Sequence, residues 1–284
     1  MSKNEFFILN MCFPGEIGLM DIASLIGIFI GIFTIFGAFC LESGSLSLIF
    51  QFSAALVVIG GTLGAIFLNF PMENILNAFK DTKKVFYNEK ENCQEILDQI
   101  IVLANVARQG GMLALQEIVT SIDNEFLRRG TQLTIDITNP ELLHEILLKE
   151  ISLDEEEGIL NARIFEAMGG FAPTFGIIGA VLGLIQVMSN LKDPTHLGQG
   201  IALSFVATFY GVGLANMIFL PIAGKLKMRL REEIVLKEMI VQGLISIHFG
   251  ENPTLIEEKL ITFLNFVNRK NQFFREYKLD ERTV

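Results

Sequence analysis

The chain has 284 residues, of which 51% are hydrophobic and only 19% carry a charge. Such an apolar composition argues against an ordinary soluble domain and favours a protein whose helices lie in lipid. The formal net charge of −10 gives no support to nucleic-acid binding, which calls for basic residues gathered on one face.

The first residues do not look like a targeting signal. Residues 1–19 contain a single lysine and a Pro-Gly pair, and they have neither the basic start nor the long apolar centre of a signal peptide. The stretch MDIASLIG, which begins at Met20, is the more natural start of the protein. Residues 1–19 are therefore interpreted as a leader or an over-extended start.

Four runs without an ionisable residue follow along the chain. They cover residues 22–41, 48–70, 168–190 and 200–222. A helix rises about 1.5 Å per residue, so each run is long enough to cross a hydrocarbon core of about 30 Å. The runs predict four transmembrane helices in two hairpins, within residues 20–70 and 168–222. Two buried hairpins in a soluble bundle are the alternative, and four separate charge-free runs argue against it.

Basic residues give the orientation of these helices. Most of them follow the second and fourth runs, as in Lys80, Lys83 and the segment 225–237, whereas the two hairpin turns hold only Lys192. The positive-inside rule places the basic flanks in the cytoplasm. It therefore predicts that residues 71–167, residues 223–284 and both termini are cytoplasmic.

The cytoplasmic segments have helical patterns. ENCQEILDQIIVLANVAR predicts a helix that ends at Gly110-Gly111, and MLALQEIVTSIDNEFLRR predicts a second one. Asn139-Pro140-Glu141 supplies a cap, a first-turn proline and an acidic start for a third. Glu155–Glu157 is interpreted as the solvated start of a further helix. After Pro221 the fourth span is expected to continue out of the membrane, until Asn252-Pro253 precedes a final amphipathic helix. The fold class is all-α, with a helical domain inserted after the second span.

The sequence offers no catalytic or metal-binding motif. It has no nucleophile elbow, no phosphate-binding loop and no cysteine or histidine cluster at ligand spacing. We therefore expect neither an enzyme nor a bound cofactor. The charge-free spans also lack the titratable group that ion translocation requires, so an ion path here would need a carboxylate from another chain.

Three stretches resemble the A subunits of bacterial flagellar motor stators, the MotA/PomA family. They are ARQGGMLALQE, APTFGIIGAVLGLIQVMSNLKDP and SFVATFYGVGLANMIFLPIAGKL. The resemblance implies an inner-membrane complex of five such chains around two B subunits, whose single helix carries the ion-binding aspartate. It also implies that ion flow turns this ring and that its cytoplasmic part pushes the rotor switch protein FliG.

The resemblance also assigns roles to single residues. Pro173 and Pro221 match the two prolines thought to couple ion binding to motion of the cytoplasmic part, and Arg108 matches a basic residue that meets the rotor. At the position of the family's acidic partner this chain has Gln116, and we expect the neighbouring Glu117 to supply the charge. One residue turns about 100° around an α-helix, so Glu117 would point in a different direction.

Ion choice is expected to depend on three positions. Sodium-type relatives carry threonines where this chain has Ala180 and Ala207, and a further threonine that matches Thr208. A methyl group cannot ligate Na⁺, which prefers oxygen, whereas a proton needs only the partner's carboxylate. The resemblance therefore favours H⁺ as the transported ion, along a path lined by these three residues.

Two alternatives stay open from the sequence. One is an energiser of outer-membrane transport similar to ExbB or TolQ, although those proteins have three spans and the large insertion after the first. The other is a membrane scaffold that conducts no ions, which would explain the uncharged spans without a partner carboxylate.

Overall fold

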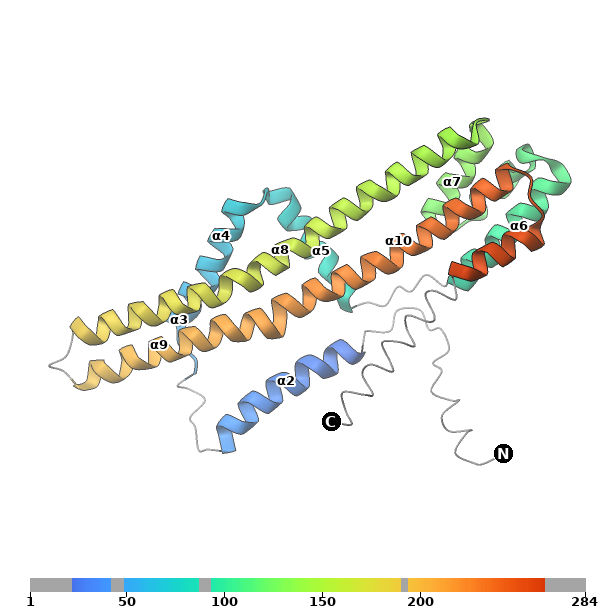
Figure 1. The fold of residues 1–284 in the computed structure, drawn as a ribbon. Coiled ribbons are helices and arrows are strands. Elements are labelled where there is room, and N and C mark those ends of the chain that lie inside the picture. The colour runs from blue at the N-terminus through green and yellow to red at the C-terminus, as the bar shows by residue number, and fades with distance from the viewer. Residues whose placement is uncertain (1–21, 42–48, 87–92, 190–193, 264–284) are drawn as a thin grey trace, which may run out of the picture. The chain divides into compact units, whose positions relative to one another are not determined.

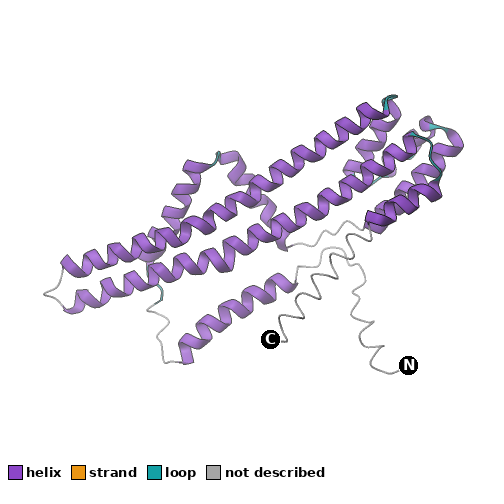
Figure 2. Ribbon diagram, viewed as in Figure 1, coloured by secondary structure: helices purple, strands orange, loops and turns teal. Residues whose placement is uncertain are grey.

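The computed structural model describes residues 22–41, 49–86, 93–189 and 194–263 (Figure 1). Within these ranges every regular element is a helix, as Figure 2 shows, so the predicted all-α class is confirmed. Residues 1–19, interpreted above as a leader, lie outside the described residues. The described residues pack as two compact units, one within residues 22–86 and 159–227 and the other within residues 93–158 and 228–263.

The first unit begins with two apolar helical segments. The 20-residue helix α2 (Ile22–Leu41) coincides with the first predicted span. The second span consists of α3 (Phe52–Ala55), the π-helical turn η2 (Leu56–Gly60) and α4 (Gly61–Asn69), which follow one another without a break. Helix α5 (Met72–Phe86) begins three residues after α4 ends.

A single helix contains the third predicted span and the segment before it. Helix α8 (Pro140–Ser189) has 50 residues, about 75 Å of helix. The side-chain oxygen of Asn139 accepts the Glu141 N–H at 2.9 Å, so the predicted cap forms. The predicted helix start at Glu155–Glu157 is wrong: these residues lie exposed in the middle of α8, because no helix-breaking residue separates them from its first turn.

The chain returns through α9 (Pro194–Leu214), the π-helical turn η5 (Ala215–Phe219) and α10 (Leu220–His248). The fourth span thus continues out of its apolar part into α10. Three helical stretches, Phe52–Asn69, Pro140–Ser189 and Gly200–His248, are long and apolar enough to cross a membrane. Together with α2, they overlap the four predicted spans, and the count of four crossings stays a prediction. The boundaries predicted at residues 70, 167 and 222 mark where the chain is expected to leave the membrane. The two compact units are defined by packing and do not test these boundaries, which stay predictions.

The second unit is a helical bundle around one core. It contains α6 (Cys93–Gly110), the 3₁₀ turns η3 (Met112–Glu117) and η4 (Val119–Ser121), α7 (Glu125–Asp136), residues 140–158 of α8, residues 228–248 of α10, and helical residues 253–263. The buried side chains at its centre are apolar: Ile100, Leu115, Leu127, Leu143, Leu147, Met239, Ile240, Leu244, Ile256 and Leu260.

The predicted helix over residues 112–129 is wrong in its first half. Two 3₁₀ turns occupy residues 112–121, and the α-helix starts only after Asn124. Asn124 has an extended backbone, and its side-chain oxygen accepts the Leu127 N–H at 2.7 Å. A new helix is capped there, because asparagine competes with a continuous helix for backbone hydrogen bonds.

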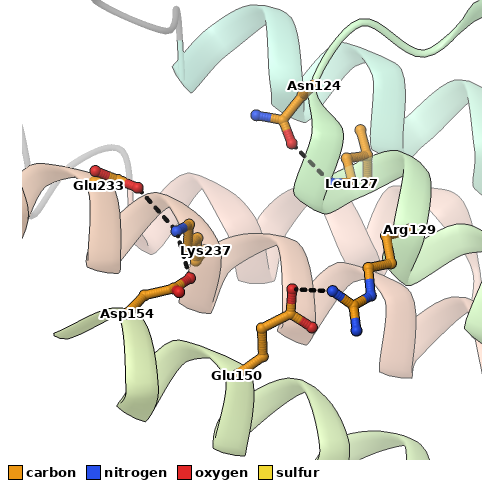
Figure 3. Close-up of polar contacts among 7 residues, drawn as sticks. All are labelled: Asn124, Leu127, Arg129, Glu150, Asp154, Glu233 and Lys237. Carbon is orange, nitrogen blue, oxygen red and sulfur yellow. Dashed lines mark hydrogen bonds and ion pairs between the residues drawn. The ribbon is translucent and has the colours of Figure 1, made fainter. Parts of the chain in front are cut away.

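Ion pairs join three helices of this bundle (Figure 3), and one of them links Arg129 Nη1 on α7 to Glu150 Oε1 on α8 at 3.1 Å. Lys237 Nζ on α10 lies 2.8 Å from Asp154 Oδ2 on α8 and 2.8 Å from Glu233 Oε1 one turn earlier. The ammonium also lies 5.7 Å from the ring centre of Phe126 on α7. Burial works to lower the pKa of Lys237, but the hydrogen bonds to Asp154 and Glu233 outweigh it and hold the pKa above the ordinary value of 10.5.

We expect Asp154→Ala to lower the free energy of unfolding of the second unit by about 1–2 kcal/mol, because it removes a charge-assisted hydrogen bond to a largely buried lysine. Since the folded pKa is raised, this stabilisation is complete at neutral pH and is lost only as the pH rises above 10.5. Thermal unfolding of the purified complex at pH 7 and pH 11 measures both effects. Glu155→Gln, an exposed change at the next position of α8, is the control; equal losses in the two variants would contradict the prediction.

Candidate functional site

Helices α8 and α9 touch along a stripe of small residues. On α8 the stripe contains Ala172, Gly176, Gly179 and Gly183, and on α9 it contains Gly200, Ser204, Ala207 and Gly211. A methyl group built on Gly211 would lie 2.5 Å from the carbonyl oxygen of Ala172 and 3.1 Å from Cα of Pro173. The two backbones are therefore in direct contact, as in close-packed membrane helices.

One close approach of the hairpin lies beside Pro173, which is half-buried inside α8. Proline has no N–H, so the Gly169 carbonyl receives no helical hydrogen bond from residue 173. The Leu220 side chain covers Gly169, where an added methyl group would lie 2.6 Å from Leu220 Cδ2. Leu220 directly precedes Pro221. Leu220 therefore contacts α8 one turn before Pro173, whereas Pro173 itself faces Gly211, ten residues before Pro221.

A widened turn precedes Pro221. In η5 the Leu220 N–H donates to the carbonyl of Ala215, five residues back, instead of the usual four. Asn216 Nδ2 donates to the carbonyl of Val212 at 2.9 Å within the same region. Such π turns are frequent at functional sites. The sequence analysis did not predict this turn, although Pro221, which has no backbone N–H to donate, was a signal for an irregular helix there.

The three predicted ion-path residues are not equivalent in the structure. Ala207 is fully buried, with its methyl group against Gly179, whereas Ala180 is half-buried and Thr208 is exposed. The Thr208 hydroxyl donates to the carbonyl of Ser204 at 3.1 Å. Among the three, Thr208 alone presents a polar side chain at the surface of the chain, and Ala207 contributes by letting the helices approach.

Ser204 is a member of this site that sequence reasoning missed. Its hydroxyl is buried and lies 2.8 Å from the carbonyl oxygen of Ala180 and 3.0 Å from that of Gly200. It therefore ties α9 to α8 at the level of a predicted path residue. Its spacing of four from both Gly200 and Thr208, on the small-residue face, could have identified it.

The predicted rotor-contact residues lie in the second unit. Arg108 is exposed in the last turn of α6, and its Nη1 donates to Asn252 Oδ1 at 3.1 Å. Gln116 and Glu117 are both exposed at the end of η3. Successive residues of a 3₁₀ helix are about 120° apart, so Glu117 points in a direction further from that of Gln116 than an α-helix would give.

No metal centre accompanies these residues in the part of the chain that the structure describes. Within it, no three side chains among His, Cys, Asp and Glu are grouped so that they could hold a metal ion. What the hairpin offers instead is an uncharged, tightly packed pair of helices with two proline interruptions.

Family models and relatives give a consistent result. Residues 118–239 match the MotA/TolQ/ExbB proton channel family, and residues 25–111 match the motility protein A N-terminal family. The chain is 33% identical over 246 residues to chemotaxis protein PomA of Vibrio alginolyticus, covering 87% of this chain and 96% of the relative. It is 32% identical over 249 residues to motility protein A of Bacillus subtilis, covering 86% and 91%.

Solved structures show the same similarity. The C. jejuni MotAB structure matches with a TM-score of 0.81 and 29% identity, over 86% of this chain and 96% of that one. The flagellar MotAB stator complex from Bacillus subtilis matches with a TM-score of 0.79 and 31% identity, over 87% and 97%.

Proposed function

The chain belongs to the MotA/PomA family of flagellar motor stator subunits, and from this we propose that it converts ion flow across the bacterial inner membrane into torque on the flagellar rotor. The observation that carries the proposal is the α8–α9 hairpin. It is closely packed and interrupted at Pro173, and residues 168–189 and 200–214 within it hold no Asp, Glu, Lys, Arg or His. Helix α8 runs from it into the second unit without a break.

A B subunit supplies what this chain lacks. Two relatives of known structure are MotAB complexes, and the predicted spans of this chain hold no Asp, Glu, Lys, Arg or His. We assign the titrating carboxylate to a MotB-like partner, with five copies of this chain around two of the partner. FliG is the proposed rotor contact, lipid surrounds the spans, and neither nucleic acid nor an enzymatic reaction belongs to the proposal.

Torque generation follows from the geometry of the hairpin. A unit charge that crosses 100 mV releases about 2.3 kcal/mol, which is comparable with the cost of repacking a few helix contacts. Protonation of the partner's carboxylate would change which face of α8 and α9 it prefers. Because Pro173 leaves the Gly169 carbonyl without its helical partner, α8 bends more easily there than elsewhere. A bend at this point moves the whole cytoplasmic length of a continuous helix.

The transported ion is proposed to be H⁺. Ala180 and Ala207 offer no side-chain oxygen, and the carbonyl of Ala180 already accepts the Ser204 hydroxyl. Thr208 has the one exposed hydroxyl among the three path residues. A Na⁺ ion requires several oxygen ligands, whereas a proton requires only the carboxylate.

We expect swimming driven by this chain and its B partner to be unaffected by external Na⁺ and to stop when a protonophore collapses the proton gradient. Swimming speed measured over a series of Na⁺ concentrations, with and without the protonophore, tests this. A speed that rises with Na⁺ and resists the protonophore would contradict the assignment of H⁺. Ala180→Thr is the comparison, because it adds a hydroxyl group of sodium-type relatives at the half-buried path position and leaves the buried Ala207 in place.

The topology belongs to the same proposal. Both termini and residues 71–167 and 223–284 are placed in the cytoplasm, and the two hairpin turns on the other side. Labelling of single cysteines with a membrane-impermeant reagent checks this, at positions in the segments 42–48 and 112–121. Labelling of intact cells at 112–121 would contradict it. The family match favours this four-span arrangement over an ExbB-like or TolQ-like energiser and over a non-conducting scaffold.

A further inference from the structure

We propose that Asn252 is a positioning residue for Arg108, holding the guanidinium in the direction in which it meets the rotor. This inference deepens the proposed function and rests on it. The two residues are 144 positions apart in the sequence, and Arg108 Nη1 lies 3.1 Å from Asn252 Oδ1.

The turn that carries Asn252 is fixed by its own hydrogen bonds. Gly250 has φ +69°, its N–H donates to the Ile247 carbonyl at 2.9 Å, and the Glu251 N–H donates to the Ser246 carbonyl at 3.1 Å. This pair of bonds around a left-handed glycine is the Schellman termination of a helix. The position of residue 252 relative to α10 is therefore determined by backbone geometry.

Asn252 then begins the last helix of the described chain, which covers residues 253–263. Its side-chain oxygen accepts the Thr254 N–H at 3.2 Å, its carbonyl accepts the Leu255 N–H at 2.8 Å, and Pro253 occupies the first helical position. Lys259 closes the turn by donating to Glu251 at 2.6 Å. This hydrogen bond is the main reason that the pKa of the Glu251 carboxyl lies below its ordinary value of 4.5, so the pair is intact at neutral pH. Asn252, whose Oδ1 accepts the Arg108 hydrogen bond, is thus held in place by the end of α10 before it and by the helix after it.

Arg108 also has a fixed base. Helix α6 packs tightly on α10, since a methyl group on Gly243 would lie 2.7 Å from Ile100 Cγ2. Arg108 follows two turns later at the end of α6 and is exposed. An exposed arginine normally samples many rotamers. Here one of its five N–H donors is bound to Asn252, and the exposed guanidinium keeps its other donors for an acidic partner.

The test separates this role from that of a helix cap. Serine caps a helix as well as asparagine does, but its shorter side chain lacks the amide oxygen that accepts the Arg108 hydrogen bond. We expect Asn252→Ser to leave the thermal stability of the complex unchanged and to lower stall torque towards the level of Arg108→Gln. In an Arg108→Gln background, Asn252→Ser is expected to have no further effect.

Asn139→Ser is the matched control. Asn139 is also an exposed cap followed by proline, so the substitution makes the same change at the same kind of position. We expect it to retain full torque. Wild-type torque in Asn252→Ser, or an equal fractional loss in the wild-type and Arg108→Gln backgrounds, would overturn the inference while leaving the proposed function intact. Full torque in Arg108→Gln alone would instead remove the proposed rotor contact, and the inference with it.

Discussion

Replacing Gly211 with alanine is expected to abolish swimming. The new methyl group would lie 2.5 Å from the Ala172 carbonyl oxygen and 3.1 Å from the Cα atoms of Pro173 and Gly176. All three are backbone atoms, so no side-chain rotation relieves the overlap and the two helices must separate. Overpacking of this kind costs about 1–3 kcal/mol when side chains can adjust, and more when they cannot. Separation at Pro173 would change the helix face that meets the partner's carboxylate.

The control is Gly213→Ala, two residues further along the same span, where an added methyl group meets no atom within 4 Å. Both changes remove one glycine from the same membrane helix, so effects on insertion and helix propensity are matched. Immunoblots of membranes and motility in soft agar measure amount and function. Full motility of Gly211→Ala, or an equal loss in Gly213→Ala, would show that the close approach at Pro173 has no special role.

Replacing Pro173 with alanine is expected to leave the complex assembled and to reduce its stall torque severely. Alanine supplies the N–H that the Gly169 carbonyl lacks, which removes the interruption in α8. Because the substitution adds a hydrogen bond and a better helix former, thermal stability should be equal or higher. The prediction is therefore a loss of function with no loss of stability, which separates a mechanical role from a structural one.

Pro140→Ala is the matched control for this substitution. Pro140 lies at the first position of the same helix, where its missing N–H has no helical acceptor in any case. Bead assays on single motors and thermal unfolding of the purified complex report on torque and stability. Normal torque in Pro173→Ala, or reduced torque in both variants, would contradict the coupling role.

Much of this fold was predictable because its signals are local. Runs without charge correctly predicted long apolar helices, and the Asn139-Pro140-Glu141 signal correctly predicted the start of α8. Glu155–Glu157 misled the sequence interpretation, since three glutamates suit an exposed helix middle as well as a helix start. The 3₁₀ turns before Asn124 were missed because apolar spacing alone does not separate them from an α-helix.

The candidate site depended more on tertiary contacts. Pro173, Pro221 and Arg108 were assigned roles by resemblance, and those roles stay predictions. The contact of Leu220 with Gly169 could not be predicted, since it joins segments 51 residues apart. The hydrogen bond from Arg108 to Asn252 joins two bundle helices through a side chain that also serves as a cap. The local sequence around Asn252 predicts that it caps a helix, but it carries no information about the hydrogen bond with Arg108.

The most direct test of the central claim is the rotation of single motors in cells that lack their own stators and express this chain with its B partner. We predict that motor speed rises in discrete steps as complexes engage the rotor, and that Asp→Asn at the ion-binding aspartate of the B partner abolishes rotation while the complex still assembles. Assembled complexes that produce no rotation, or rotation that persists without that carboxylate, would contradict the account.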